Sequence, residues 1–358
     1  MGVANSPLHP LEEPVTAART KPRVVVVTGG SAGVGRAAAA AFARQGFMVA
    51  VLARGHDRLK DTCTGLEALG ARCIGVATDV ADAEAVEAAA SRVEMELGPI
   101  DVWVNNAMTS VLSLTHQLTA DEVRRVTEVT YLGSVNGILS ALRRMRARGS
   151  GTIVQVGSAL AYRAIPLQAS YCGSKFAIRG FTDALRTELL AESSPVTITS
   201  VHLSAFNTPQ FEWVRTRLAG HPQPVPPIYQ PEVAARAILW AATHRRREIW
   251  VGGPAVATIM ANSVIPGLLD RYLARTGIDS QQIDEPVDPG RPDNLWDPVA
   301  GHSSAHGRFD DRSRHRSWQL QASLHRRWLA GAASLVTLSR VAARRRLAHG
   351  ASGRSGQA

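Results

Sequence analysis

Short apolar segments alternate with longer helical segments between residues 23 and 252, and this order restricts the fold more than any other feature of the chain. The expected strands, rich in β-branched residues, are 24–28, 47–53, 73–77, 100–104, 152–156, 196–202 and 248–251. The expected helices are 35–45, 57–69, 82–97, 121–148, 170–191 and 231–243. Strands that alternate with helices of about ten or more residues pair in parallel, and the helices cover both faces of the sheet. The sequence therefore predicts an α/β fold: one doubly wound parallel sheet in a single domain with a C-terminal extension.

The same alternation sets the expected domain boundaries. Residues 1–20 are rich in proline and polar side chains, and we expect a flexible N-terminal arm. Residues 21–255 hold the alternation and form the sheet domain. Residues 256–290 are expected to pack on that domain as an extension. Residues 291–358 are polar and rich in Gly and Arg, which favours a basic, partly disordered tail.

The formal net charge of +10 does not indicate a nucleic-acid-binding surface, because most of it lies in the tail. Residues 291–358 hold 12 Arg and 4 acidic residues, whereas residues 1–290 are almost neutral. No aromatic stacking pattern or binding motif accompanies these arginines, so no nucleic-acid partner is expected.

An apolar stretch at 328–338 is too short to span a bilayer, which needs roughly 20 residues. Peripheral membrane contact through this stretch and a disordered tail are both open.

Cysteine and histidine usage argues against two further classes of protein. The three cysteines (Cys63, Cys73 and Cys172) are too few and too irregularly spaced for a disulfide framework or a zinc site. The 11 histidines show no metal-ligand spacing, so no metal is expected. No apolar segment near the N-terminus resembles a signal peptide. We expect a cytoplasmic protein, with membrane association through the tail as the open alternative.

A glycine-rich loop joins the first expected strand to the first expected helix. Glycines let the backbone turn sharply and let a pyrophosphate approach the helix N-terminus, where N–H groups and the helix dipole stabilise the anion. The position in the first strand–helix unit favours a Rossmann-like dinucleotide site over a simple structural turn. The residues expected to bind the cofactor here are Thr28, Gly29, Ser31, Gly33, Val34 and Gly35.

The end of the second expected strand bears on the choice of cofactor. An acidic residue there would bind the adenosine ribose hydroxyls and suit NAD. The chain has Ala53 followed by Arg54 instead, and a guanidinium suits the 2′-phosphate of NADP. We therefore expect NADP(H) to be preferred, with NAD(H) as the alternative if Arg54 lies on a solvated loop.

Tyr171 and Lys175 lie four residues apart at the start of a long expected helix, so both side chains can face the same way. A nearby ammonium lowers the pKa of a phenol and makes it a usable general acid or base. Ser158 ends the fifth expected strand, at the sheet edge where α/β proteins bind ligands. Its hydroxyl can donate a hydrogen bond to a carbonyl oxygen. A solvated amphipathic helix face is the alternative interpretation of the pair.

The sequence resembles the short-chain dehydrogenase/reductase family over about residues 23–252. The resemblance rests on the glycine-rich loop, on Asp79-Val80 after the third expected strand and on Asn105-Asn106-Ala107 after the fourth. It also rests on Ser158 lying 13 residues before the Tyr171 and Lys175 pair. This order and spacing of motifs is specific to the family.

The resemblance implies a role for each matching residue. Tyr171 exchanges a proton with the substrate oxygen, and Lys175 lowers the tyrosine pKa and binds the nicotinamide ribose, so both also face the cofactor. Ser158 orients the substrate. Asp79 and Val80 lie by the adenine ring, while Asn105 and Ala107 support the cofactor site. Hydride passes directly between nicotinamide and substrate carbon.

Three positions depart from the family pattern. Met108 replaces a glycine that usually follows Asn-Asn-Ala, which narrows or covers the site. Thr130 stands where an asparagine often belongs to a proton relay, and a hydroxyl copies an amide only in part. Thr208, expected to hold the nicotinamide carboxamide, follows Ser204-Ala205-Phe206-Asn207 rather than the usual Pro-Gly.

These observations predict an NADP(H)-dependent oxidoreductase acting on a small carbonyl or alcohol, with Ser158, Tyr171, Lys175 and Thr130 as the catalytic set. The expected substrate loop, about residues 206–228, is largely apolar, so an apolar substrate is expected. The resemblance also implies a homo-oligomer formed through the helices at 121–148 and 170–191. Met108 and Thr130 leave one alternative open: a low-activity nicotinamide-binding sensor or scaffold that acts through its tail.

Overall fold

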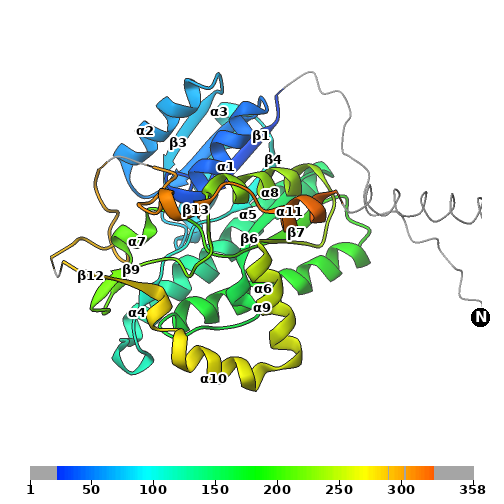
Figure 1. The fold of residues 1–358 in the computed structure, drawn as a ribbon. Coiled ribbons are helices and arrows are strands. Elements are labelled where there is room, and N and C mark those ends of the chain that lie inside the picture. Colours follow the sequence, from blue (N-terminus) through cyan, green and yellow to red (C-terminus); the bar gives the residue numbers. More distant parts are fainter. Residues whose placement is uncertain (1–21, 289, 302–303, 326–358) are drawn as a thin grey trace, which may run out of the picture. The chain divides into compact units, whose positions relative to one another are not determined.

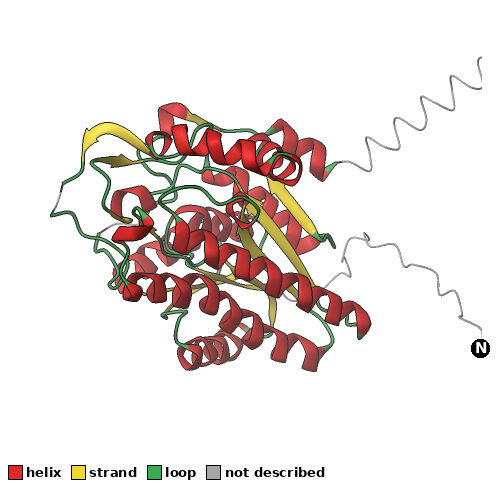
Figure 2. Ribbon diagram, turned by 90° about the horizontal axis from the view of Figure 1, so that it is seen from below, coloured by secondary structure: helices red, strands yellow, loops and turns green. Residues whose placement is uncertain are grey.

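A seven-stranded parallel sheet forms the centre of the protein, with helices on both of its faces (Figures 1 and 2). The computed structural model describes residues 22–288, 290–301 and 304–325. The strand order β11-β7-β6-β4-β1-β2-β3 runs outward from β1 in both directions, so the predicted doubly wound α/β fold is confirmed. The strands are β1 (Val24–Thr28), β2 (Met48–Ala53), β3 (Cys73–Ala77), β4 (Ile100–Asn105), β6 (Thr152–Ser158), β7 (Thr197–Leu203) and β11 (Glu248–Val251).

The helices that connect these strands form a layer on each face. On one face α1 packs against α2 and α8, and on the other α3 packs against α5 and α4 against α6. The connecting helices are α1 (Gly33–Arg44), α2 (His56–Glu67), α3 (Ala83–Leu97), α4 (Ala120–Thr127), α5 (Gly133–Arg148), α6 (Ala169–Ala191) and α8 (Pro231–Thr243).

Burial on both faces explains why the central strands are continuously apolar rather than alternating. Every residue of β1 is buried, and so is every residue of β4. Trp103 on β4 is fully buried, and its indole N–H donates to the Asn105 side-chain oxygen at 2.8 Å, so the one polar atom of that ring is satisfied. These strands hold the loops at their carboxyl ends in place.

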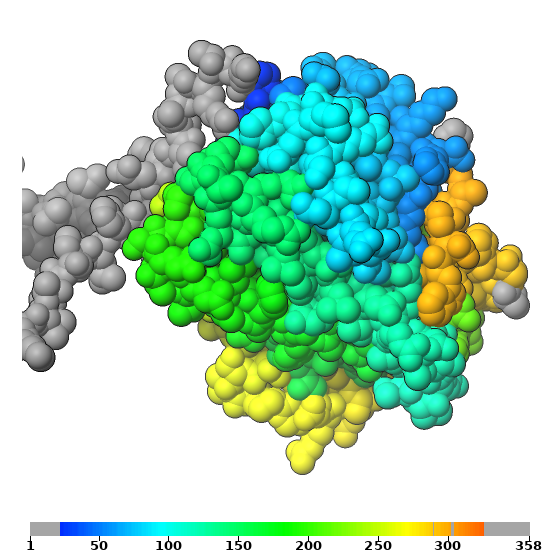
Figure 3. All heavy atoms as spheres, turned by 180° about the vertical axis from the view of Figure 1, so that it is seen from behind, coloured from blue at the N-terminus to red at the C-terminus, as the bar shows by residue number. Residues whose placement is uncertain are grey.

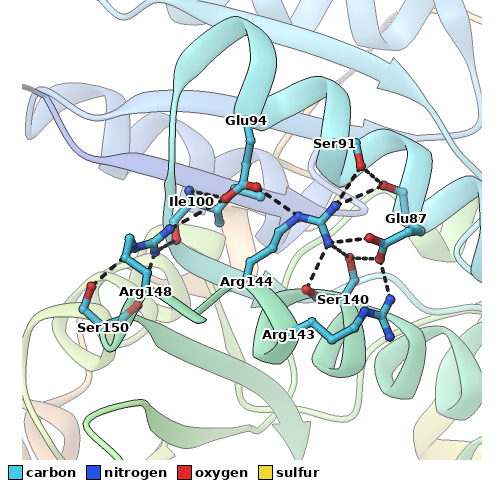
Figure 4. A network of polar contacts seen from close by, with 9 residues as sticks. All are labelled: Glu87, Ser91, Glu94, Ile100, Ser140, Arg143, Arg144, Arg148 and Ser150. Atoms are coloured by element: carbon cyan, nitrogen blue, oxygen red, sulfur yellow. Dashed lines mark hydrogen bonds and ion pairs between the residues drawn. The ribbon is translucent and has the colours of Figure 1, made fainter. Parts of the chain in front are cut away.

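An ion-pair network holds the outer faces of α3 and α5 together (Figure 4). Glu87 of α3 accepts hydrogen bonds from Ser140 and Arg143 and forms an ion pair with Arg144 at 2.7 Å. Glu94, two turns further along α3, pairs with Arg144 at 3.2 Å. Each pair is partly exposed and contributes little alone, but the shared partners fix the register of the two helices.

Two sequence predictions need correction here. The single helix expected at 121–148 is α4, a π-helical turn (Glu128–Leu132) and α5, because the chain leaves the α-helical hydrogen-bond pattern around Thr130. The structure also pairs Cys63 of α2 with Cys73 of β3 in a disulfide, with Cα atoms 5.4 Å apart. The expectation that the cysteines form no framework overlooked this pair, because the strand after α2 returns beside it.

The chain beyond β11 adds small elements to the same unit, which ends at residue 317. Helix α9 (Gly253–Val264) and helix α10 (Pro266–Thr276) follow each other directly. Strand β12 (Gln282–Pro286) pairs with β9 (Gly220–Pro222), and β13 (Ser313–Arg314) pairs with β10 (Ile228–Tyr229). Three other short elements lie before β11: β5 (Val111–Leu112), α7 (Gln210–Trp213) and β8 (Arg215–Thr216).

A second unit starts at Trp318 and contains α11 (Trp318–Leu324). The apolar stretch at 328–338 lies outside the described residues. Within the described ranges, no helix is both long and apolar enough to cross a membrane.

Candidate functional site

Two cavities meet at the carboxyl ends of the central strands. The first, which we call the glycine-loop cavity, has a volume of about 260 Å³. The second, which we call the α9–α10 cavity, has a volume of about 380 Å³. Met108, Ser158 and Tyr171 line both cavities, so a molecule in one can touch a molecule in the other at these residues.

Most of the predicted site residues line the glycine-loop cavity. Four predicted residues do not line it: Thr28, Gly35, Asn105 and Thr130. The predicted residues that line it are Gly29, Ser31, Gly33, Val34, Arg54, Asp79, Val80, Ala107, Ser158, Tyr171, Lys175 and Thr208.

The glycine-rich loop needs its glycines for two different reasons. Gly29 and Gly33 adopt φ values of +63° and +55°, which favour glycine. A Cβ on Gly35 would lie 2.3 Å from the carbonyl oxygen of Gly29, so only glycine fits there. Helix α1 begins at Gly33, and its N-cap residue Ala32 offers no side-chain acceptor. The N–H of Gly33 donates to the Ser304 carbonyl at 2.9 Å, so anion binding at the cavity falls to the other N–H groups of this first turn.

Hydrogen bonds attach this loop to the end of β4. The Thr28 hydroxyl accepts from the backbone N–H of Asn106 at 3.0 Å and of Ala107 at 3.1 Å. The Asn106 amide donates in return to the Thr28 carbonyl at 3.0 Å. Asn105 points the other way: it is buried and donates to the Ser134 carbonyl at 3.1 Å. Asn106 lines the cavity although the sequence analysis gave it no role, and its place in the quoted motif was the available signal.

Asp79 lies in the cavity wall as a charged carboxylate. It accepts a hydrogen bond from the Ala81 N–H at 3.0 Å and forms an ion pair with Arg125. Burial opposes the charge, but the hydrogen bonds from Arg125 and Ala81 together hold the pKa of Asp79 below its usual value. The negative charge therefore persists at neutral pH.

Two arginines after β2 form the far end of the cavity. Arg54 was predicted from the sequence, whereas Arg58, in the first turn of α2, was not. Burial lowers the pKa of both guanidinium groups, which nevertheless stay charged at neutral pH. The Arg58 guanidinium lies over the Trp213 ring, 4.2 Å from its centroid. The missed signal was proximity in the sequence: Arg58 lies only four residues after Arg54, at the start of α2.

Ser158, Tyr171 and Lys175 come together as predicted, but not with the predicted electrostatics. Ser158 and Tyr171 hydrogen-bond through their side chains. The Lys175 ammonium donates to the Val156 carbonyl at 3.0 Å and lies 5.5 Å from the centroid of the Tyr171 ring. Loss of solvation raises the pKa of Tyr171, and the Ser158 hydrogen bond offsets this only in part. The predicted lowering of the phenol pKa by Lys175 is not seen, because the ammonium is directed to a carbonyl instead.

Thr130 is not brought to this group. It is fully buried in the π-helical turn. Its hydroxyl donates to the Thr109 carbonyl at 3.0 Å and accepts from the Thr109 N–H at 3.1 Å. Because the hydroxyl both donates to and accepts from the backbone of Thr109, it positions the segment after Met108 and does not contact reacting atoms. Thr208 lines the cavity and packs against Gly33.

The α9–α10 cavity is lined mainly by apolar side chains. Leu160, Ile165 and Phe211 line it, and Phe211 belongs to the expected substrate loop at about 206–228. Trp213 of the same loop faces the glycine-loop cavity, and the Tyr162 hydroxyl donates to Glu248. Residues of α9 and α10, which the sequence analysis did not assign, close its far side. They are Pro254, Ala255, Thr258, Leu269, Tyr272 and Leu273.

We expect the free energy of unfolding to rise between pH 8 and 9 in the protein without added cofactor, and to rise much less in Lys175→Met. Burial lowers the pKa of Lys175 from 10.5 to about 8, so the unfolded chain binds this proton more tightly. Stability then increases with pH from about 8 upward, by at most about 3 kcal/mol. Chemical denaturation at the two pH values measures it.

Comparison with Lys175→Met separates this effect from that of two opposing groups, one of which, Cys172, already titrates in the unfolded chain between pH 8 and 9. Burial raises the pKa values of Cys172 and Tyr171, and both therefore reduce stability at more alkaline pH. Equal pH dependence in the parent protein and Lys175→Met would contradict the burial of a charged ammonium.

Comparison with known proteins gives consistent matches. Residues 23–218 match the family model described as short chain dehydrogenase. Over 309 residues the chain is 31% identical to the uncharacterized oxidoreductase YxnA of Bacillus subtilis (strain 168), covering 86% of this chain and 85% of that relative.

Two solved structures share the fold and about a quarter of the sequence. An alcohol dehydrogenase from the archaeon Thermococcus sibiricus, complexed with 5-hydroxy-NADP, has 27% identity and a TM-score of 0.56, covering 64% of this chain and 96% of that one. L-sorbose reductase from Gluconobacter frateurii, complexed with NADPH and L-sorbose, has 25% identity and a TM-score of 0.58, covering 65% and 96%.

Proposed function

This chain belongs to the short-chain dehydrogenase family and is an NAD(P)-dependent oxidoreductase, and from that premise we propose its cofactor, its proton donor and its substrate class. The proposed cofactor is NADP(H), the proposed proton donor is Tyr171, and the proposed substrate is an apolar carbonyl compound or the corresponding alcohol.

The observation that carries this proposal is the meeting of the two cavities at Ser158 and Tyr171. One cavity has a glycine-rich helix N-terminus and two arginines, which suit a phosphorylated dinucleotide. The other is mainly apolar, which suits an uncharged substrate. A carbonyl group at the junction would lie between the two hydroxyl groups and the reduced nicotinamide.

The side chains at the junction suit reduction of a carbonyl. NADPH, when bound, supplies the hydride to the carbonyl carbon. The Tyr171 phenol transfers its proton to the carbonyl oxygen, and Ser158 donates a hydrogen bond that orients the same oxygen. The Tyr171 phenol, whose pKa is raised by burial, is protonated at neutral pH and can therefore donate this proton. In the reverse direction the deprotonated oxygen of Tyr171 accepts the proton of the alcohol.

Arg54→Ala is expected to weaken NADPH binding about tenfold or more and to leave NADH binding almost unchanged. The lost guanidinium is a charge-assisted partner for the 2′-phosphate, which NADH lacks. Fluorescence titration of both reduced cofactors measures the two Kd values. Equal losses for both cofactors, or none for either, would show that Arg54 does not select NADP.

We also propose an assembly and a location for this protein. Leu139 on α5 and Phe176 on α6 are 44% and 42% exposed, which supports the homo-oligomer expected through these helices. The molecular mass in solution tests it. The cytoplasmic location and a peripheral membrane contact through residues 328–338 rest on the sequence alone, and fractionation of the full chain tests both.

A further inference from the structure

Residues 290–301, which we call the strap, run along the end of the glycine-loop cavity. Figure 3 shows this orange segment on the surface beside the blue region after β2. Three contacts fix its course: Leu295 is fully buried with Val111 and Val126, Asp293 pairs with Arg215 at 3.0 Å, and the Asn294 N–H donates to a carbonyl of α7 at 3.0 Å. The strap is therefore a fitted part of the domain, although it lies some 40 residues beyond the last strand of the sheet.

The strap presents backbone carbonyls to the arginines of the cavity. Arg54 donates to the carbonyls of Asn294 at 2.5 Å and Trp296 at 2.6 Å. Arg58 donates to the carbonyl of Ala300 at 3.2 Å. These contacts fix the direction of two long side chains that would otherwise move freely in solvent. Each guanidinium has five N–H groups, and the strap carbonyls accept from only some of them.

In the described ranges, neither guanidinium group is bound directly to a carboxylate, although the charges of Asp79 and of the strap residue Asp297 lie near enough to favour the charged form of Arg54. Within the same ranges, the Arg58 Nε is buried without a hydrogen-bond partner. Both side chains are partly removed from water and line one cavity with Asn294, Pro298 and Val299 of the strap. Two adjacent, partly buried cations with spare donors favour a phosphate.

We propose that the strap is the outer wall of a subsite for the 2′-phosphate of NADP(H), and that its carbonyls hold Arg54 and Arg58 in the orientation that binds this phosphate. This proposal rests on the proposed NADP(H) preference. It assigns the choice of cofactor in part to residues beyond the last strand of the sheet, which position the two arginines rather than contact the reacting atoms.

The test releases the strap in the full-length protein and measures Kd for NADPH and NADH. In Leu295→Asp a buried leucine becomes a carboxylate, and we expect NADPH to bind about tenfold more weakly, with NADH within about twofold. Asp293→Ala is milder, because it removes only the Arg215 ion pair and the hydrogen bond from the Leu295 N–H at 3.0 Å. It should weaken NADPH binding about threefold, and it carries the test if Leu295→Asp does not fold.

Two matched controls carry the same substitutions outside the strap. Leu268→Asp changes a leucine of α10 that is 58% exposed, and Asp284→Ala changes an exposed aspartate of β12. Neither should alter the ratio of the two Kd values.

The outcomes separate this proposal from the one on which it rests. Equal binding of NADPH and NADH by the parent protein would overturn the NADP(H) preference and the subsite with it. A preference that depends on Arg54 but survives both strap variants would overturn the role of the strap alone. Tighter NADPH binding in the variants would also overturn it, since the strap would then compete with the phosphate. An equal loss of affinity for NADPH and NADH in a folded variant would also overturn the role of the strap.

Discussion

Tyr171→Phe is expected to lower kcat about 1,000-fold and to leave the Kd for NADPH within about twofold. The phenol is the proposed source of the proton, and Ser158, its hydrogen-bond partner, has a far less acidic hydroxyl. Phenylalanine keeps the packing of the ring against Leu295 and its neighbours, so the cavity should keep its shape. Steady-state turnover of an apolar ketone, together with cofactor titration, measures both quantities.

Tyr162→Phe is the matched control. The Tyr162 hydroxyl donates to Glu248 at 2.6 Å and lines neither cavity, so its removal should lower the melting temperature but not kcat. Similar turnover in Tyr171→Phe and the parent protein would rule out Tyr171 as the proton donor.

Gly35→Ala is expected to weaken the binding of NADPH and NADH alike, about 100-fold. The added methyl group would lie 2.3 Å from the Gly29 carbonyl oxygen and 2.5 Å from the Asn106 amide nitrogen. The glycine-rich loop and the β4 loop would have to separate, which removes the anion-binding geometry at the start of α1. Titration with both cofactors measures the effect, and circular dichroism checks that the sheet domain still folds.

Gly180→Ala provides the comparison for this substitution. Gly180 lies in the interior of α6, and a Cβ there meets nothing within 4 Å. Alanine should stabilise the helix by up to about 1 kcal/mol and leave cofactor binding unchanged. Unaltered cofactor affinity in Gly35→Ala would mean that the dinucleotide does not bind at this loop.

The fold could be predicted well because its determinants are local. The predicted bounds of the strands at 24–28, 73–77 and 248–251 and of the helix at 231–243 are those of the structure. The other central strands differ by one or two residues at an end. The π-helical turn at Glu128–Leu132 was missed, because one such turn hardly changes the spacing of apolar residues from that of an uninterrupted α-helix. The cavity lining was largely predictable too, since most of its residues end a strand or begin a helix.

Predictions failed where the outcome depends on backbone groups or on distant segments. Lys175 has the predicted position, but its ammonium donates to the backbone carbonyl of Val156. Because every residue has such a carbonyl, the sequence gives no sign of which one the ammonium will bind. Thr130 is similarly taken up by the backbone of Thr109. The strap also binds Arg54 through backbone carbonyl oxygens. The polar side chains of the strap therefore gave no sign that this segment packs on the domain.

Transfer of deuterium from NADPH to a substrate tests the central claim most directly. NADPH carrying deuterium on both C4 positions is incubated with the protein and a panel of apolar ketones, and the alcohol products are analysed by mass spectrometry and NMR. We predict that deuterium appears on the carbinol carbon, and that the product is almost absent with Tyr171→Phe. Tight binding of NADPH with no labelled alcohol from any ketone would contradict hydride transfer at this site and favour a nicotinamide-binding sensor or scaffold.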